Sequence, residues 1–460
     1  MSTAVTGATP DVAQAFLRQN PDVEAIDIVL SDMHGIGRGK TIRRHELDSL
    51  YASGRGMPAS LFAQDVEGND VAAALATFDD KGGDSRCWPV AGTLGRQPLN
   101  GRGLVLLKML DDAGHPVAHD PRAALDRQIA RARTLGFAPK GAFELEFYLI
   151  DAERDAQGRP QPLRTPLGHR RLSSTNCMSV DELDQMSPFF EAIYDAAKGF
   201  DLPLESLISE YAEGQFELTL RYGDLGRAAD HLILAKQLIR TTARRFGMAA
   251  CFMSKPFGDL SGSGMHMHLS LADQTGENGF ADDPDGALSP LMLQAIGGIR
   301  SAMADTMLVL APVLNSWRRF ASTVYSPAEN SWGCEDRNVA LRIPDSSAAT
   351  RHFEHRLAGI DANPYLVAAV ILGSALDGIE SAAQPGPEGA NTAGSGTDTA
   401  FPALPHTWLE AIEAFEGSQG MADILGAPLH QALSAIKRAE HDRLAAHVTE
   451  IEWQIYGGTL

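Results

Sequence analysis

Several short segments combine acidic, histidine and arginine residues at spacings suited to binding metal ions and phosphate. The first is Phe143-Glu144-Leu145-Glu146-Phe147, in which apolar and acidic residues alternate. Alternation with a period of two predicts a β-strand with both glutamates on one face. Two like charges on a half-buried strand are costly unless a cation neutralises them. The segment therefore predicts either a divalent metal site or an acidic face in contact with water.

A second segment shows the same alternation with histidines. Residues 262–270 read Gly-Ser-Gly-Met-His-Met-His-Leu-Ser, and a strand near Met265 to Ser270 places His266, His268 and Ser270 on one face. A neutral imidazole binds metal ions or donates to phosphate, and the glycines allow the backbone to approach a ligand closely. Histidines paired within a core are the alternative explanation.

Two further acidic residues, Glu210 and Glu217, flank a turn that leads into a strand predicted near Phe216 to Arg221. On that strand Glu217 shares a face with Gln215. In Arg351-His352-Phe353-Glu354-His355-Arg356, an extended chain turns Glu354 and Arg356 the same way, which suits a metal beside an anionic substrate or a structural salt bridge.

Several arginines lie close together between residues 318 and 342, in a chain whose overall charge is strongly acidic. Because arginine offers a planar fork of donors, the cluster is typical of carboxylate and polyphosphate binding, although a basic surface would also explain it. The sequence contains no GxxxxGK[ST] loop and no strand-linked GxGxxG, so metals and arginines would have to hold any nucleotide. The cluster consists of Arg318, Arg319, Arg337 and Arg342.

The elements that position these residues form an α+β protein with a small and a large domain. Residues Val23 to Thr41 predict a β-hairpin with a glycine-rich turn, and a polar turn after Leu110 suggests a division into domains 1–114 and 115–460. Asp120 and Pro121 are typical of a helix start. Residues 382–405, rich in Gly, Pro, Ser and Thr, predict a loop. Helices are predicted at Asp230–Phe246, Ser289–Leu310, Pro364–Ser381, Thr407–Glu416 and Pro428–Thr449.

The composition limits the classes of partner. The chain has 460 residues, 44% of them hydrophobic and 21% charged, as in ordinary globular proteins. A formal net charge of −20 argues against nucleic acid or an anionic membrane as the main partner. The four scattered cysteines have no zinc spacing and indicate reduced thiols, and the N-terminus lacks the features of a signal peptide. We therefore expect a cytoplasmic protein.

Taken together and in this order, the motifs resemble glutamine synthetases of the bacterial type. The matching segments are FELEF, EGQFE, GSGMHMH, NSWRR, the pair Arg337 and Arg342, FEHR, and DANPYL after it. The resemblance extends from Phe143 to Leu366 and adds the late Leu404-Pro405. It implies a small N-terminal β-grasp domain followed by a glutamine synthetase-type catalytic domain.

The resemblance also implies roles for individual residues. Two divalent ions, Mg²⁺ or Mn²⁺, would be held by two sets of ligands: Glu146, Glu210 and Glu217 near the substrate carboxylate, and Glu144, His266 and Glu354 against the ATP phosphates. ATP would contact His268, Ser270, Arg337 and Arg342. L-Glutamate would contact Gly262, Arg319 and Arg356. The catalytic arginines would be Arg319, Arg337 and Arg342.

The implied reaction joins glutamate to an amine at the expense of ATP. The γ-carboxylate attacks the terminal phosphate to give γ-glutamyl phosphate, and an amine then displaces phosphate. In such enzymes, two stacked hexameric rings share their sites between neighbouring subunits. No tyrosine occurs in residues 382–405, where adenylylated members carry their regulatory one, so we expect no adenylylation control.

The departures from the family pattern concern the amine. The position of the ammonium-binding glutamate is Tyr325, and an unperturbed phenol, with a pKa of about 10, neither attracts ammonium nor deprotonates it readily. The FDGSS-like segment is replaced by residues 61–68, and Ser261 stands where asparagine is usual. These changes favour a larger amine, as in γ-glutamylpolyamine and γ-glutamylputrescine synthetases. Asp65, Glu67 or Glu329 would then be candidates to hold a distal ammonium.

Three other functions remain open. Glutamine synthetase proper would use ammonia at a different site. A nitrogen sensor or crystallin-like structural protein would have little reason to keep so many costly buried polar groups. A guanido kinase would transfer phosphate to a guanidinium.

Overall fold

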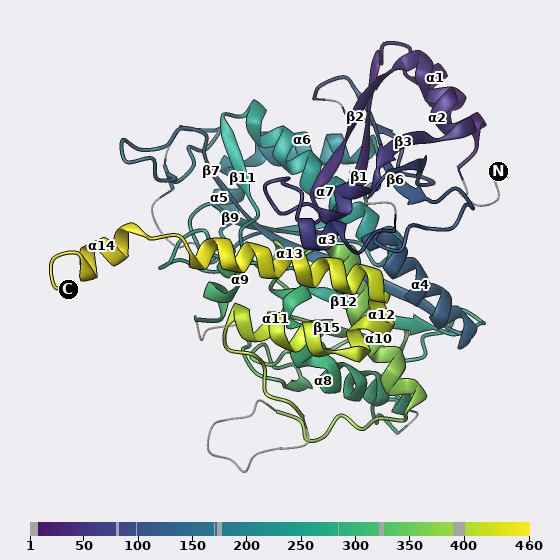
Figure 1. Ribbon diagram of the computed structural model, residues 1–460, viewed down its shortest axis with the longest axis vertical. Helices are drawn as coiled ribbons and strands as arrows, with labels where there is room; N and C mark the ends of the chain where they lie inside the picture. The colour runs from purple at the N-terminus through teal and green to yellow at the C-terminus, as the bar shows by residue number, and fades with distance from the viewer. Residues whose placement is uncertain are drawn as a thin grey trace.

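The computed structural model describes residues 8–79, 82–97, 99–169, 171–172, 177–283, 285–321, 326–389 and 401–460. It contains two β-sheets with helices packed around them, which confirms the α+β class (Figure 1). Within these ranges no helix combines the length and the apolar composition needed to cross a bilayer. Each of the four cysteines is a free thiol, as predicted.

The first sheet has six strands and is formed by the N-terminal part of the chain. Strands β1 (Ala25–Ser31) and β2 (Gly37–Arg43) are antiparallel, which confirms the predicted hairpin, and β6 (Gly103–Leu110) runs parallel to β1. The strand order is β2-β1-β6-β4-β3, with β5 beside β6. The remaining elements are α1 (Pro10–Gln19), α2 (Leu47–Ser53), β3 (Arg55–Pro58), α3 (Ala72–Leu75), β4 (Asp84–Pro89) and β5 (Gly95–Arg96).

The second sheet has nine strands, and its central member is the long strand β7 (Ala138–Asp151). The order is β13-β14-β15-β12-β7-β9-β8, with β10 and β11 also paired to β7. All the predicted strands after residue 115 belong to this sheet. The other strands are β8 (Leu204–Ser209), β9 (Gln215–Leu220), β10 (Gly223–Asp224), β11 (Met248–Cys251), β12 (Met267–Ala272), β13 (Trp332–Cys334), β14 (Leu341–Ile343) and β15 (Phe353–His355).

Helices cover the second sheet, and α10 lies at their centre, packed against α4, α7 and α8. Because α10 is apolar on nearly all sides, it is buried along most of its length. The predicted helix Pro428–Thr449 is wrong at its end, since Thr449 caps a separate helix that extends away from the body (Figure 1). The helices are α4 (Pro121–Thr134), α5 (Val180–Gln185), α6 (Ser187–Lys198), α7 (Leu225–Arg245), α8 (Pro290–Leu310), α9 (Leu314–Trp317), α10 (Pro364–Glu380), α11 (Trp408–Gly417), α12 (Gln419–Leu425), α13 (Ala427–Ala445) and α14 (Glu450–Tyr456).

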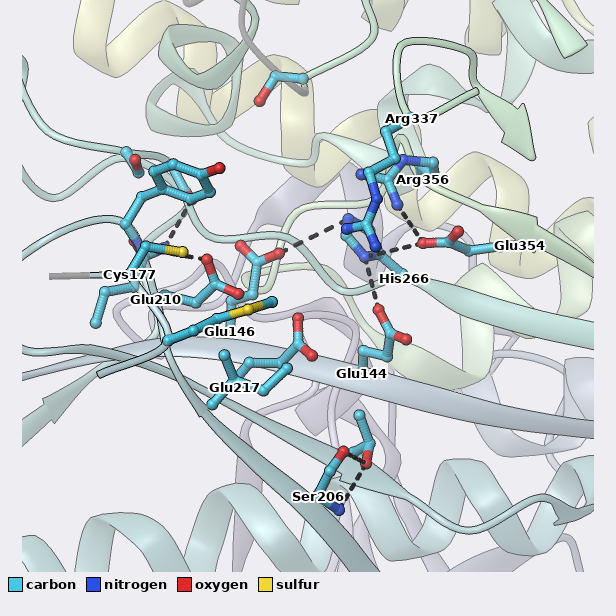
Figure 2. A pocket seen from close by; sticks show the side chains of 18 of the residues that line it. Glu144, Glu146, Cys177, Ser206, Glu210, Glu217, His266, Arg337, Glu354 and Arg356 are labelled. Carbon is cyan, nitrogen blue, oxygen red and sulfur yellow. Dashed lines mark hydrogen bonds and ion pairs between the residues drawn. The ribbon is translucent and has the colours of Figure 1, made fainter. Parts of the chain in front are cut away.

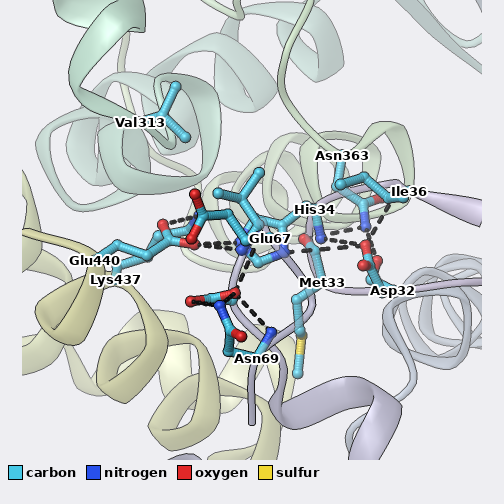
Figure 3. Close-up of polar contacts among 12 residues, drawn as sticks. Asp32, Met33, His34, Ile36, Glu67, Asn69, Val313, Asn363, Lys437 and Glu440 are labelled. Atoms are coloured by element: carbon cyan, nitrogen blue, oxygen red, sulfur yellow. Dashed lines mark hydrogen bonds and ion pairs between the residues drawn. The ribbon is translucent and has the colours of Figure 1, made fainter. Parts of the chain in front are cut away.

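The turn of the N-terminal hairpin contacts the helical part of the chain through polar groups (Figure 3). The carboxylate of Asp32, fully buried, accepts hydrogen bonds from the backbone N–H groups of His34 and Ile36 at 2.8 and 2.9 Å. The His34 ring lies 2.8 Å from Glu440 on α13, and the side chain of Asn363 donates to the Asp32 carbonyl. Both sheets are thus held in one body. The predicted division at residue 114 lies between β6 and α4 and stays a prediction.

A buried ionic cluster fastens α4 to α7 and α10. Arg122 donates to both carboxylate oxygens of Asp230, at 2.9 and 3.1 Å, and the Tyr365 hydroxyl donates to the same carboxylate at 2.8 Å. Asp230 and Tyr365 are both 1% exposed. Because the hydrogen bonds satisfy a charged group inside the protein, the loss of one leaves an uncompensated polar atom.

We expect Tyr365→Phe to lower the free energy of unfolding by about 1.5–3 kcal/mol, the range for a hydrogen bond to a charged group. Urea unfolding followed by circular dichroism measures this change. Tyr194→Phe is the matched control, because the Tyr194 hydroxyl donates to the Glu205 carbonyl at the protein surface. Equal effects of the two substitutions would contradict the role of the cluster.

Candidate active site

The acidic strand forms the floor of a cavity of about 500 Å³ (Figure 2). Along β7, Glu144 and Glu146 line the cavity, whereas Phe143, Leu145 and Phe147 are fully buried on the other side. The predicted alternation is therefore confirmed. The apolar face holds the strand in the core, and this fixes the direction of both carboxylates.

Other strands of the same sheet, β9 next to β7 and β15 beyond β12, bring more ligating groups to the same face. On β9, Glu217 lies directly opposite Glu146, and on β15, Glu354 lies opposite His268 of β12. Directly opposite like charges destabilise a sheet unless a cation lies between them. All six predicted metal ligands line the cavity: Glu144, Glu146, Glu210, Glu217, His266 and Glu354.

The two histidines both contact Glu144, as expected for residues on one face. The Nδ1 atom of His266 lies 2.9 Å from one carboxylate oxygen of Glu144, and the Nε2 atom of His268 lies 2.9 Å from the other. His266 also lies 3.3 Å from Glu354. Despite burial, these neighbours hold the pKa of Glu144 well below its usual range and raise the pKa of His268.

The pKa of Glu217 is shifted in the opposite direction to that of Glu144. Glu217 is 7% exposed, and no ion pair to it is formed among the described residues. Burial, together with the charges of Glu144 and Glu146, raises its pKa to about 10. Burial and Glu146 raise the pKa of Glu210 to about 7. A buried carboxylate among other carboxylates is a suitable ligand for a divalent cation, which removes this repulsion.

The donor set fits hard divalent ions. Two overlapping groups have ligand atoms within 4.8 Å of one another: Glu144 with His268 and Glu354, and Glu144 with Glu217 and His266. Carboxylate oxygens with one imidazole suit Mg²⁺ or Mn²⁺. The groups combine the ligands differently from the predicted sets, since His268 joins one of them and Glu144 belongs to both.

Four of the predicted arginines line the cavity: Arg319, Arg337, Arg342 and Arg356. Arg356 and Arg342 both pair with Glu354, the latter at 3.2 Å. Arg337 is exposed at the edge of the cavity (Figure 2). Arg318 lines a neighbouring cavity instead.

The glycines of the Gly-Ser-Gly turn make room for Arg319. A Cβ atom on Gly262 would lie 2.7 Å from the Arg319 side chain, and one on Gly264 would lie 2.8 Å from its guanidinium. We expected these glycines to allow a ligand to approach, and the structure shows that they admit a buried arginine. Gln215 donates to the Gly262 carbonyl at 2.9 Å and so holds the turn in place.

A smaller cavity of about 200 Å³ lies on the other side of Glu144, which lines both cavities. His268 and His352 line it with their rings 5.1 Å apart. Tyr222 also lines it and hydrogen-bonds to Ser270, which is itself buried. Tyr222 and His352 were not predicted as site residues, because no local pattern connects them with the strand of His268.

One side of the main cavity carries residues that the sequence did not indicate, including Cys177, Met178, Ile208 and Tyr211. Met178 is 65% exposed and has a positive φ of 58°, a conformation that is rare for a bulky side chain. Isolated residues in loops have no periodicity by which to predict them. These residues come together as one rim of the cavity only in the folded structure, where strands and loops distant in the sequence meet.

The positions that depart from the family pattern, and two of the acids considered for a distal ammonium, have separate outcomes. Tyr325 lies outside the described residues, whereas Ser261 lines the main cavity and its carbonyl accepts a hydrogen bond from Tyr148. Asp65 and Glu67 both pair with Arg443 on α13, at 3.1 and 2.6 Å, and do not line the cavity of their own chain.

Comparison with known proteins supports the same class of site. The sequence profile of the glutamine synthetase catalytic domain matches residues 118–456. The γ-glutamylputrescine synthetase PuuA of Escherichia coli (strain K12) is 35% identical over 446 residues, 96% of this chain and 93% of that protein. The γ-glutamylethanolamide synthetase GlnA4 of Streptomyces coelicolor is 30% identical, over 94% of this chain and 92% of that protein.

A solved structure shares the complete fold. The complex of GmaS with ADP superposes with a TM-score of 0.83 at 28% identity, covering 97% of this chain and 99% of GmaS. The chain therefore belongs to the glutamine synthetase family. Within this family it is an ATP-dependent glutamate–amine ligase, as the resemblance in the sequence implied.

Proposed function

We propose that the acceptor is an organic amine, with a short aliphatic diamine such as putrescine as the first candidate. The observation that carries this proposal is the rim of Met178, Ile208 and Tyr211 beside Glu210, which offers apolar surface to an alkyl chain. Ammonia has no such chain to bury. Two relatives support an organic amine by their names, which are γ-glutamylputrescine synthetase and γ-glutamylethanolamide synthetase.

In this proposal the arginines bind the reacting anions. Arg319 and Arg356, both buried, would bind the glutamate carboxylates beside the backbone of Gly262. Arg337 and Arg342 would contact the phosphoryl group. Their positive charges offset the repulsion between the γ-carboxylate and ATP.

The nucleotide would lie in the smaller cavity, against His268 and near Ser270 and Tyr222, with its phosphates reaching toward Glu144. Two Mg²⁺ or Mn²⁺ ions would be held by the cavity carboxylates and His266. When bound, they supply positive charge that binds the phosphates and polarises them.

The reaction would proceed in two displacements. An oxygen of the γ-carboxylate attacks the terminal phosphorus of ATP, and ADP leaves. The amine nitrogen then attacks the γ-carbonyl carbon of γ-glutamyl phosphate, inorganic phosphate leaves, and the nitrogen loses one proton. Burial of Arg319 and Arg356 fixes their positions before the substrates bind, so little reorganisation is needed.

Phosphate release with ATP, Mg²⁺ and L-glutamate tests the proposal when several amines are compared. We expect kcat/KM for putrescine to exceed that for ammonia at least about 100-fold, with mass spectrometry identifying the γ-glutamyl product. Spermidine, ethanolamine and alkyl monoamines complete the set. Activity with ammonia alone would contradict the proposal and indicate a glutamine synthetase.

We also propose that the enzyme is cytoplasmic and assembles into two stacked hexameric rings, as the family resemblance implies. The small N-terminal domain, residues 1–114, would then meet the catalytic domain, residues 115–460, of a neighbouring subunit. Acids such as Asp65 and Glu67 would reach only a neighbour's site. Mass photometry that shows no particle of twelve chains would contradict this assembly.

A further inference from the structure

Asp361 lies behind the arginines of the main cavity, in the loop just before α10. One of its carboxylate oxygens accepts two hydrogen bonds, from the backbone N–H of Ser254 at 3.2 Å and from the hydroxyl of Ser316 at 3.0 Å. Both serines are buried, at 0% and 1% exposure. Asp361 itself does not line the cavity.

The two donors belong to the two segments that form the proposed glutamate site. Ser254 begins the loop to Gly262, and its carbonyl accepts a hydrogen bond from Ser263 at 2.8 Å. Ser316 lies in α9, three residues before Arg319. The carboxylate of Asp361 therefore joins the backbone beside Gly262 to the helical turn that carries Arg319.

The loop of Asp361 also holds Arg319 directly. The guanidinium of Arg319 donates to the carbonyls of Leu357 at 3.0 Å and Arg356 at 3.2 Å. The buried ammonium of Lys236 donates to the carbonyl of Ile360. Residues 356–361 thus form a rigid support for the arginine.

We propose that Asp361 is a positioning residue for the glutamate site, which sets the distance between Gly262 and Arg319. The inference rests on the proposed binding of glutamate by these two residues. Without the carboxylate, both segments lose their common acceptor. Arg319 and the Gly-Ser-Gly turn are then held less firmly relative to each other, and glutamate binding weakens more than ATP binding.

Steady-state kinetics of Asp361→Ala and Asp361→Asn test this proposal. We expect Asp361→Ala to raise KM for glutamate about 10- to 100-fold, since two hydrogen bonds to a buried carboxyl oxygen are lost, while KM for ATP changes less than about threefold. Asp361→Asn should restore KM for glutamate to within about threefold of the wild type, because its amide oxygen can accept both hydrogen bonds.

Asp305→Ala is the matched control, because Asp305 accepts a hydrogen bond from Ser418 at 2.6 Å and does not line the cavity. It should leave both KM values unchanged. If Asp361→Ala does not fold, Ser316→Ala tests the same proposal. We expect it to raise KM for glutamate about three- to tenfold, because one of the two hydrogen bonds is lost.

Two results would overturn the inference: unchanged KM for glutamate in Ser316→Ala and Asp361→Ala, or equal rises in KM for glutamate and ATP. Absence of any glutamate-dependent reaction in the wild type would instead refute the proposed function. The two failures are therefore distinguishable.

Discussion

Glu217→Gln should lower kcat at least about 1,000-fold and abolish the stabilisation of the protein by Mg²⁺ or Mn²⁺. A metal ion that stabilises transition-state charge contributes several kcal/mol, and each 1.36 kcal/mol corresponds to a factor of about ten in rate. Glu217 is the buried carboxylate that faces Glu144 and Glu146, so it has the strongest need for a cation. An amide keeps the shape of the side chain and removes its charge.

The pH dependence of the metal-free protein provides an independent readout. Burial and the neighbouring carboxylates raise the pKa of Glu217 from its ordinary value of 4.5 to about 10. The folded state therefore keeps a proton that the unfolded state releases, and stability falls as the pH rises from 4.5 toward 10. Glu217→Gln should flatten this decline. Bound metal should oppose it, because metal displaces the proton.

Urea unfolding at pH 6 and pH 9, with and without metal, measures both effects. Glu416→Gln is a suitable control, because Glu416 pairs with Arg438 outside the cavity at 2.6 Å. A Glu217→Gln protein that metal still stabilises like the wild type would show that Glu217 is not a ligand.

Arg337→Ala should lower kcat about 1,000-fold with little loss of stability. An arginine that stabilises a transferring phosphoryl group contributes about 10³–10⁵ in kcat. Arg337 lies exposed at the cavity edge, so its removal leaves the core packing unchanged. We expect KM for glutamate to change less than about threefold, because Arg319 and Arg356 remain.

Arg337→Lys separates charge from geometry. Lysine keeps the positive charge but lacks the planar fork, so we expect partial activity, between the values for wild type and Arg337→Ala. Arg438→Ala is the control, because Arg438 pairs with Glu416 on another part of the surface. Activity of Arg337→Ala within tenfold of the wild type would exclude a role in phosphoryl transfer.

The local patterns of the sequence were sufficient to predict on which face of a strand each site residue lies. Alternation along Phe143 to Phe147 places both glutamates on one face, because successive side chains of a strand point to opposite sides. The same reasoning predicted the shared face of His266 and His268. The order of the motifs also identified the family, since each motif keeps its residue types and spacing.

The distances between these motifs depended on the tertiary structure. The register that sets Glu146 opposite Glu217 joins residues far apart in the chain, and no local pattern specifies it. The packing of Arg319 against Gly262 and Gly264 likewise follows from the meeting of two loops.

Residues that belong to no periodic pattern could be connected with the site only from the tertiary structure. Tyr222, Met178 and Asp361 lie in turns and loops, where a side chain's direction depends on contacts with other segments. Short-range sterics and the burial of apolar residues thus predicted which side chains face the site. Long-range hydrogen bonding and packing determine which of them meet, because those free energies arise only when distant segments come together.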